Sequence, residues 1–229
     1  MPTSPPSSES RVVRAADGAF LRIAPQASTA QVDEVLAQRA ARRRPQRAGI
    51  RVRGDAPQIF GPVLSALAQV GSPQEVTDRT CAAPADASLT LALHAIRNQD
   101  DEDIADADLA AGFAVVRVHR EDDVLFVHPL ADPSDPRAVR AVDVRARRMA
   151  ASPAPEHLAR TWHEVGGDPL LDLPPVAAAL AAAHVLESCL DLLHQVPARG
   201  PSLLFRLEMT PLRLSEHPVL RVPETEPLR

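Results

Sequence analysis

One group of residues that could carry chemistry is a glycine-containing turn. The segment Gly54–Pro57 follows a short apolar stretch and precedes a helical pattern, with Gly61 a few residues later. A dinucleotide-binding βαβ unit places G-x-G-x-x-G at such a turn, so that backbone N–H groups reach phosphate at the helix N-terminus. Here Ala56 replaces the second glycine, Gly61 is displaced, and Pro57 removes an N–H donor. The turn therefore matches a nucleotide site poorly.

Two carboxylates accompany this turn. Asp55 would lie near the place that a pyrophosphate occupies in a dinucleotide-binding unit. Asp78 follows at about the sequence spacing of the acidic residue that contacts the ribose in such units. The pattern favours a βαβ turn that binds no nucleotide. The alternative is an atypical nucleotide- or dinucleotide-binding site formed by Gly54, Asp55, Gly61 and Asp78.

A second group is the histidines, none of which has a recognisable metal-ligand spacing. His119 and His128 can meet only if the strands that carry them pair. No G-x-S-x-G elbow marks a serine nucleophile. We therefore expect surface histidines or satisfied core histidines, with no catalytic residue and no metal site. The eight histidines are His94, His119, His128, His157, His163, His184, His194 and His217.

Other polar clusters fit structural roles. The acidic run Asp100–Asp108 lacks the alternating ligands of a calcium loop, so a solvated segment is expected. Two arginine clusters suit helix surfaces, or an anchor for an acidic peptide or partner helix: Arg42–Arg44, and Arg145 with Arg147 and Arg148. Cys81 and Cys189 belong to no C-x-x-C pair and are expected to be buried thiols.

Composition limits the functional classes. The 229 residues carry a net charge of −5, which argues against a nucleic-acid footprint. All 25 basic residues are arginine, so neither a Schiff-base lysine nor a phosphate-binding lysine exists. The first residues have no signal-peptide pattern, and Val176–Leu193, the most apolar stretch, is interrupted by polar residues. We expect a cytoplasmic protein with no membrane segment.

Pattern changes divide the chain into three parts. Residues 1–10 are rich in serine and proline and are predicted to be disordered. Residues 11–47 predict a small appendage: a hairpin around Asp17-Gly18, then a helix that Ser28 or Thr29 could cap. Residues 48–229 predict the main domain.

The main domain begins with a βαβ unit. Its first strand is centred on Ile50, its helix should begin near Phe60 or Gly61 because of Pro62, and QEVTD forms its second strand. The segment SLTLALHAIRN predicts a helix, whereas GFAVVRVH and DDVLFVHPL predict buried strands. Two short helices, a long alanine-rich helix and antiparallel strands complete the chain. The expected fold is α/β, with a mostly parallel sheet, flanking helices and an antiparallel C-terminal hairpin.

The segment AGIRVRGDAPQIFGPVLSALAQVG resembles the degenerate first βαβ unit of the ThiF-like (ubiquitin-activating-enzyme-like) family. The later strand GFAVVRV, the turn VHPLADPSDP, the helix PPVAAALAAAHVLESCLDLL and the segment SEHPVLRVP follow in that family's order across residues 48–223. The resemblance is to the branch that partners YcaO-type cyclodehydratases in making modified ribosomal peptides. Active members use a glycine-rich loop and a lysine around ATP, and many relatives hold zinc with two C-x-x-C pairs. This chain has neither, so no cofactor is expected.

The resemblance implies a non-catalytic scaffold or partner subunit that presents a precursor (leader) peptide to a modifying enzyme. The family's peptide-recognition module adds the leader as a strand beside a helix, and residues 11–45 match only a trimmed form. The implied edge is Val12, Val13, Phe20, Leu21 and Ile23, and the implied groove is Val32, Val35 and Leu36. The same residues could instead be core, or a dimerisation arm. A homo- or hetero-oligomer is expected; a purely structural homodimer is a third interpretation.

Overall fold

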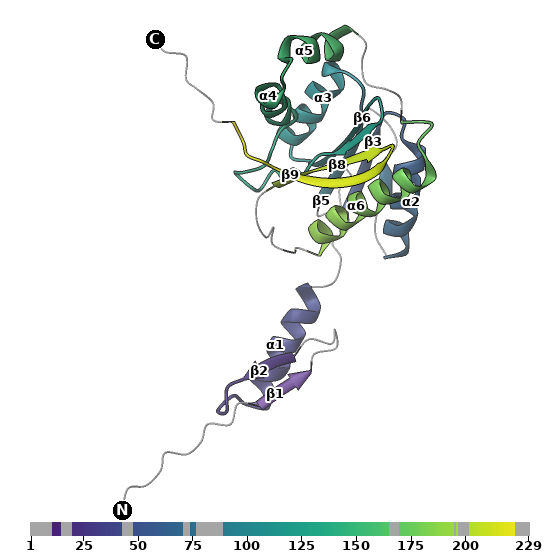
Figure 1. Ribbon diagram of the computed structural model, residues 1–229. Coiled ribbons are helices and arrows are strands. Elements are labelled where there is room, and N and C mark those ends of the chain that lie inside the picture. The colour runs from purple at the N-terminus through teal and green to yellow at the C-terminus, as the bar shows by residue number, and fades with distance from the viewer. Residues whose placement is uncertain are drawn as a thin grey trace, which may run out of the picture. The chain divides into compact units, whose positions relative to one another are not determined.

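The computed structural model describes residues 11–14, 20–42, 48–70, 74–76, 89–164, 170–194, 196 and 202–222. The chain forms two compact units, Met1–Arg44 and Pro45–Arg229. The smaller unit consists of an antiparallel hairpin, β1 (Arg11–Arg14) and β2 (Phe20–Ile23), and a helix, α1 (Thr29–Arg42) (Figure 1). The predicted disordered segment 1–10 and the turn at Asp17-Gly18 lie outside the described residues.

A reciprocal cap starts α1. The backbone N–H of Gln31 donates to Ser28 Oγ at 3.3 Å, and the backbone N–H of Ser28 donates to Gln31 Oε1 at 2.9 Å. This S-x-x-Q capping box satisfies helix donors that would otherwise lack partners. Of the two caps that the sequence allowed, the structure uses Ser28.

The larger unit is built on one seven-stranded sheet in the order β4-β3-β5-β6-β7-β8-β9. Pairing is parallel from β4 to β6 and antiparallel from β6 to β9. This arrangement, with helices on both faces, confirms the predicted fold class. The strands are β3 (Ala48–Arg53), β4 (Gln74–Val76), β5 (Leu89–Ile96), β6 (Ala114–Glu121), β7 (Val124–Val127), β8 (Ser202–Met209) and β9 (Leu212–Val219).

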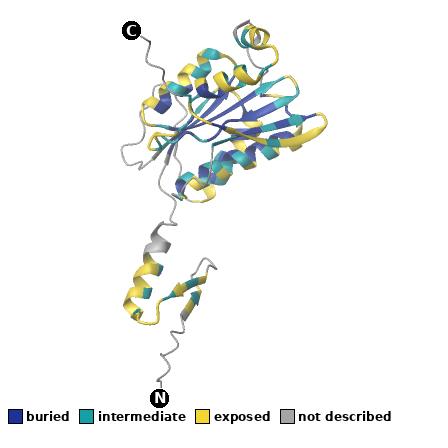
Figure 2. Ribbon diagram, turned by 60° about the vertical axis from the view of Figure 1, so that its left-hand side comes forward, coloured by how far each residue is buried: buried dark blue, intermediate teal, exposed yellow. Residues whose placement is uncertain are grey.

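The two faces of this sheet carry different sets of helices. In Figure 1, α2 (Pro57–Gln69) and α6 (Pro175–Leu193) cover one face. The other face carries α3 (Gln99–Ala110), α4 (Ala141–Ala151) and α5 (Pro155–Glu164). Figure 2 shows the central strands of the sheet as mostly buried between these layers, whereas the edge strand β9 is mostly exposed.

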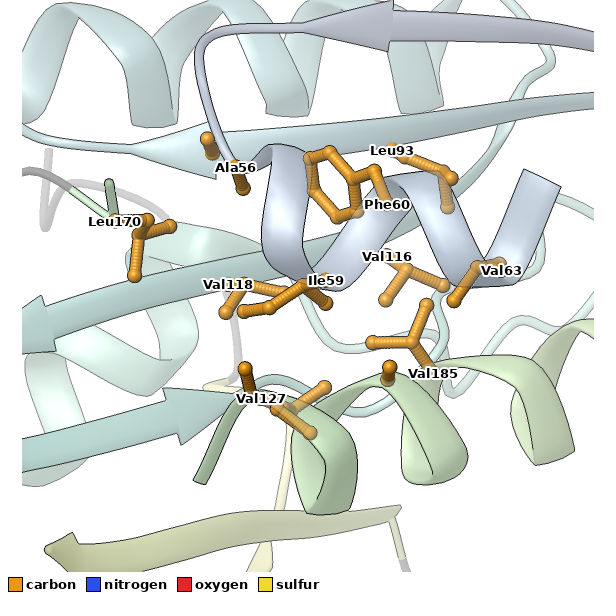
Figure 3. Packing of buried hydrophobic residues seen from close by; sticks show 14 of the residues in the cluster. Ala56, Ile59, Phe60, Val63, Leu93, Val116, Val118, Val127, Leu170 and Val185 are labelled. Carbon is orange, nitrogen blue, oxygen red and sulfur yellow. The ribbon is translucent and has the colours of Figure 1, made fainter. Parts of the chain in front are cut away.

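The main core lies between the sheet and the α2–α6 layer. Ile59 and Val63 of α2 point toward Val116 and Val118 of β6, with Val185 of α6 alongside (Figure 3). All five side chains are buried. The alanines of α6 allow close helix packing, and this helix contributes more residues to the core cluster than any other.

By length and composition alone, α6 could also cross a membrane. In the structure, however, its buried residues face the core of the larger unit. Cys189 lies on this face, and burial raises the pKa of its thiol to about 12. This helix therefore acts as a core helix in the fold described here.

The helix predicted for SLTLALHAIRN is wrong, because Leu89–Ile96 forms strand β5. Leu91 and Leu93 lie in one apolar cluster and Ala92 in another, so both faces of this strand are buried. A run that is apolar on both sides has no clear period, and periodicity cannot separate a buried strand from a buried helix. Pairing with β3 on one side and β6 on the other decides the outcome.

The start predicted for the first helix of the main domain is also wrong. The helix α2 begins at Pro57 and contains Pro62 in its interior. Pro57 occupies the first helical position, where a missing N–H costs nothing and the fixed φ favours helix. The buried stripe Ile59, Phe60 and Val63 keeps the helix intact through the second proline.

Candidate functional site

The predicted peptide-binding residues all lie in the hairpin–helix unit. Within that unit five are half-buried: Val13, Leu21, Ile23, Val32 and Leu36. The other three are exposed: Val12 by 59%, Phe20 by 72% and Val35 by 48%. In the hairpin, Val13 lies opposite Leu21, and Arg14 lies opposite Phe20.

None of the described side chains of this unit is buried. The hairpin forms a two-stranded sheet in the described part of the chain, so β1 and β2 each keep one edge without a paired strand. An isolated hairpin is marginally stable in water, and an open edge is a template for another strand. Within the described residues, both edges of the hairpin are therefore open to another strand.

The glycine turn has a structural explanation. Gly54 has φ of 77°, and a Cβ at this position would lie 2.8 Å from the carbonyl oxygen of Ala95 in β5. Glycine is therefore required by close packing against the neighbouring strand. Gly61 lies inside α2, Asp55 is exposed, and Asp78 lies outside the described residues. The structure thus places Gly54 and Asp55 in the turn but Gly61 in the helix.

The N-terminus of α2 offers few donors for phosphate. Pro57 has no N–H, and the N–H of Ile59 is bonded to the carbonyl of Ala56. The side-chain oxygen of Gln58 accepts a hydrogen bond from the backbone of Leu173. Leu170 and Ala56 are buried in the same core cluster. A chain segment thus packs where a nucleotide would approach.

The sheet face beneath α3 carries a buried polar cluster that the sequence analysis did not find. Asp108 of α3 accepts hydrogen bonds from Arg51 Nη1 at 2.8 Å, Arg53 Nε at 2.8 Å and His94 Nε2 at 3.0 Å. Burial alone would raise the pKa of Asp108, but the hydrogen bonds from His94 and Arg53 outweigh it and lower the pKa to about 2. The cluster fixes α3 to β3 and β5.

A second polar contact fixes α4 to α3. The carboxylate of Asp106 accepts hydrogen bonds from the backbone N–H groups of Ala141 and Val142, at the start of α4. Negative charge at this end also complements the helix dipole. Beside it, Arg145 Nη1 of α4 donates to Glu102 Oε2 at 2.7 Å. These contacts set the position of α4 over the sheet.

A chain of polar groups connects β6 and β7 to α4 and α5. Arg148 forms a two-pronged ion pair with Glu121, whose Oε1 also accepts the indole N–H of Trp162 at 2.8 Å. The Arg148 guanidinium lies 4.3 Å from the ring centre of Phe126. This one arginine therefore joins the sheet, α4 and α5.

His119 and His128 extend this series of polar contacts. As the sequence required, β6 and β7 pair, and His119 Nδ1 lies 3.0 Å from His128 Nε2. Arg148 Nη1, which can only donate, lies 3.0 Å from His119 Nε2. This contact assigns the proton of His119 to Nδ1, which donates to His128. The Nδ1 of His128 then carries a buried N–H with no partner among the described residues.

Burial lowers the pKa of both His119 and His128, so both are neutral at pH 7. Glu121 has its pKa held far below the usual range because the hydrogen bonds from Arg148 outweigh the effect of burial. Glu102 behaves in the opposite way, since burial raises its pKa to about 7 despite the nearby Arg145. Two carboxylates in one region thus have very different proton affinities.

A pocket opens beside these groups, at the carboxyl ends of β5 and β6. It is partly open to solvent. In sheets of this kind, ligands bind outside the carboxyl ends of the parallel strands. The pocket is lined by Ile96, Arg97, Asn98, Gln99, Glu102, His119, Glu121 and Trp162.

The signal for these polar groups is present in the sequence as alternation. Arg51 and Arg53, and likewise Arg117, His119 and Glu121, are two residues apart, so each set faces one side of its strand. The apolar residues between them made these segments resemble continuously buried strands, so the alternation was missed. Among the described residues, no group of three or more histidine, cysteine or acidic side chains could hold a metal ion.

No model of a known family matches the chain, and no curated protein matches it. Solved structures do share the fold. One is described as a heterocyclase in complex with substrate and cofactor, with a TM-score of 0.51 and 16% identity. That similarity covers 88% of this chain but 28% of the heterocyclase, so this chain spans little more than a quarter of that protein.

A second similar structure is a chain of the E. coli microcin synthetase McbBCD complex. Its TM-score is 0.58 and its identity 11%, over 80% of this chain and 69% of that one. The same complex with pro-MccB17 bound gives a TM-score of 0.53 at 11% identity, over 78% and 68% of the two chains. At these identities the likeness shows the fold alone. It agrees with the resemblance found in the sequence, and membership of that family stays a prediction.

Proposed function

We propose that this protein is a non-catalytic partner subunit of an assembly that modifies a ribosomally made peptide. Its hairpin–helix unit would hold the leader segment of the precursor for a separate modifying enzyme, such as a YcaO-type cyclodehydratase. The observation that carries this proposal is the two-stranded hairpin, with its open edges and its exposed apolar side chains. A leader that adds a strand would satisfy the edge and cover those side chains.

Two further observations support the proposal. The fold is shared with chains of heterocyclase and microcin synthetase structures, one of which holds a substrate and another pro-MccB17. The turn after β3 has a packing reason for Gly54, and the adjoining helix begins with a proline. Both features favour a subunit that needs no nucleotide.

The first test measures nucleotide binding. Thermal unfolding of the full chain is followed with ATP–magnesium, AMP, NAD and NADP, each at millimolar concentration. The expected result is no change in midpoint with any of them. A ligand at one hundred times its dissociation constant would add about 2.7 kcal/mol of stability, and a rise of that size would overturn the non-catalytic assignment.

The second test measures peptide binding directly. The full chain selects from a phage library of random peptides long enough to form a strand, and enriched peptides are titrated against variants. Phe20→Asp combined with Val35→Asp should weaken binding at least tenfold, because it places charge on exposed apolar surface of the hairpin–helix unit. Leu171→Asp, at an exposed leucine of the larger unit, is the matched control and should bind as wild type. Failure to enrich any peptide, or equal binding by all three proteins, would refute the proposal.

A further inference from the structure

The pocket at the carboxyl ends of β5 and β6 has one wall that is already fixed. Both oxygens of Glu121 are engaged, by Arg148 and by the indole N–H of Trp162. The charge of Arg148 is thereby neutralised, and the indole is held in place where it lines the pocket. This wall presents an aromatic ring and a neutralised ion pair.

The lining also includes a carboxylate, Glu102, that retains an open position. Glu102 Oε2 accepts from Arg145, while Glu102 Oε1 has no hydrogen-bond partner within the described parts of the chain. Its side chain is 16% exposed, so a group in the pocket can reach it. Ile96 adds apolar surface to the lining. A carboxylate oxygen, an indole and an aliphatic surface together suit a cation carried on an alkyl chain.

The charges around Glu102 also favour a cation. Arg145 from α4 and Arg117 from β6 lower its pKa, whereas Asp103 and Asp106 of its own helix raise it. Arg97, at the rim, is occupied by Asp101, its Nε lying 3.3 Å from that carboxylate. The first turn of α3 adds the exposed Asp100. Each of these three arginines has an acidic partner, and Asp100 and Asp103 add further negative charge to α3.

We propose that this pocket binds the guanidinium of a peptide arginine, placed against the Trp162 indole and paired with Glu102. A planar guanidinium can stack on an indole and donate to a carboxylate at the same time, which an ammonium does less well. The peptide origin of the arginine rests on the proposed function.

Binding is coupled to the protonation of Glu102. A cation beside this carboxylate favours its ionised form, so binding releases a proton when Glu102 starts protonated. With the pKa of free Glu102 at about 7, the ionised fraction rises about tenfold from pH 6 to pH 8. The affinity for a guanidinium should rise by about the same factor over this range. Burial also lowers the pKa of His119, which lines the pocket, and this favours its neutral form.

The chain provides its own reporter for this site. Trp162 is its single tryptophan, and the chain has no tyrosine, so its intrinsic fluorescence comes from the pocket. N-acetyl-arginine amide is titrated into the full chain at pH 6, 7 and 8, alongside the lysine and citrulline analogues. Citrulline has nearly the same shape as arginine without the charge. A saturable change is expected with arginine, a weaker one with lysine and none with citrulline.

Glu102→Gln should weaken arginine binding about tenfold at pH 8 and abolish its pH dependence. Glu187→Gln is the matched control, because it removes the same charge from an exposed position on α6 and should bind as wild type. The pH series and the citrulline comparison need no variant, so they decide the matter even if Glu102→Gln unfolds. An equal response to citrulline, or an affinity unchanged between pH 6 and pH 8, would overturn the proposal.

The hairpin variant separates this inference from the proposed function. Phe20→Asp combined with Val35→Asp should leave binding of N-acetyl-arginine amide unchanged, since both substitutions lie in the smaller unit. If the amide binds but no library peptide does, the pocket stands and the leader-binding role fails. If peptides bind and the amide does not, the pocket assignment fails alone.

Discussion

Replacing Asp108 with asparagine tests whether the polar cluster beneath α3 stabilises the larger unit. The carboxylate is 8% exposed and contacts Arg51, Arg53 and His94. Asparagine keeps the shape and one oxygen, but removes the charge that the two guanidiniums face. Arg51 and Arg53 would then be held in place without their shared counter-ion.

The expected cost follows from the burial of the partners. Removing one member of a buried ion pair costs roughly 3–5 kcal/mol. The side chains of Arg51 and Arg53 are 12% and 20% exposed, so water reaches them in part and the lower end applies. We expect Asp108→Asn to lose about 3 kcal/mol, which lowers the midpoint of thermal unfolding by about 6–12 °C in a domain of this size.

The pH dependence of this loss has a defined sign. The pKa of Asp108 falls from 3.8 to about 2 on folding, so its contribution is present above pH 3.8 and disappears as the pH falls through about 2. Between pH 5 and pH 3 the wild type should lose about 1 kcal/mol of this contribution, and the variant none. The difference in the free energy of unfolding between the wild type and Asp108→Asn should therefore become smaller as the pH falls.

Urea unfolding followed by circular dichroism, at pH 7, 5 and 3, measures this difference directly. Asp55→Asn is the matched control, because Asp55 is an exposed aspartate of the same unit and its loss should change stability little. A loss below about 1 kcal/mol at pH 7 would refute the role given to the cluster. So would a difference that stays constant from pH 5 to pH 3.

The turn after β3 and the buried histidines provide two more predictions. Gly54→Ala should lower the free energy of unfolding by at least about 2 kcal/mol, because its Cβ would lie 2.8 Å from the carbonyl oxygen of Ala95. Gly112→Ala is the control: Gly112 has φ of 93° but open space around it, so the loss should be about 1 kcal/mol. Equal losses in urea unfolding would contradict the close-packing explanation. Burial keeps His128 neutral in the folded state, so its contribution to stability is complete above pH 6.5 and should fall by about 1 kcal/mol between pH 7.5 and pH 5.5. His128→Gln should lose less stability than wild type over the same interval, and an identical loss in both proteins would show that His128 is protonated in the folded state.

Local patterns predicted most of the elements correctly. The βαβ unit (apart from the start of its helix), the strands Ala114–Glu121 and Val124–Val127, the alanine-rich helix and the C-terminal hairpin form where the sequence places them. Each has a clear period or a clear turn signal within a short window, which is the information that a sequence pattern holds. The N-cap of α1 is equally local, because Ser28 and Gln31 bond each other across three residues.

The elements that sequence reasoning missed depend on contacts between distant residues. Leu89–Ile96 is a strand because β3 and β6 pair with it on both sides. Its apolar run fits a buried helix equally well, since a segment that is buried on both faces shows neither period clearly. Only the sheet resolves that ambiguity.

The residues of the larger unit's candidate site show the same division. The sequence by itself determined the fold class, the poor match of the Gly54 turn to a nucleotide site and the condition under which His119 and His128 could meet. Only the tertiary structure brought Arg51 to Asp108, 57 residues away, and Trp162 to Glu121, 41 residues away. Polar side chains at alternate strand positions predict a solvent-exposed face, whereas in the folded protein helices cover that face and bury them. Their chemistry is decided by burial and by partners, which no local pattern specifies.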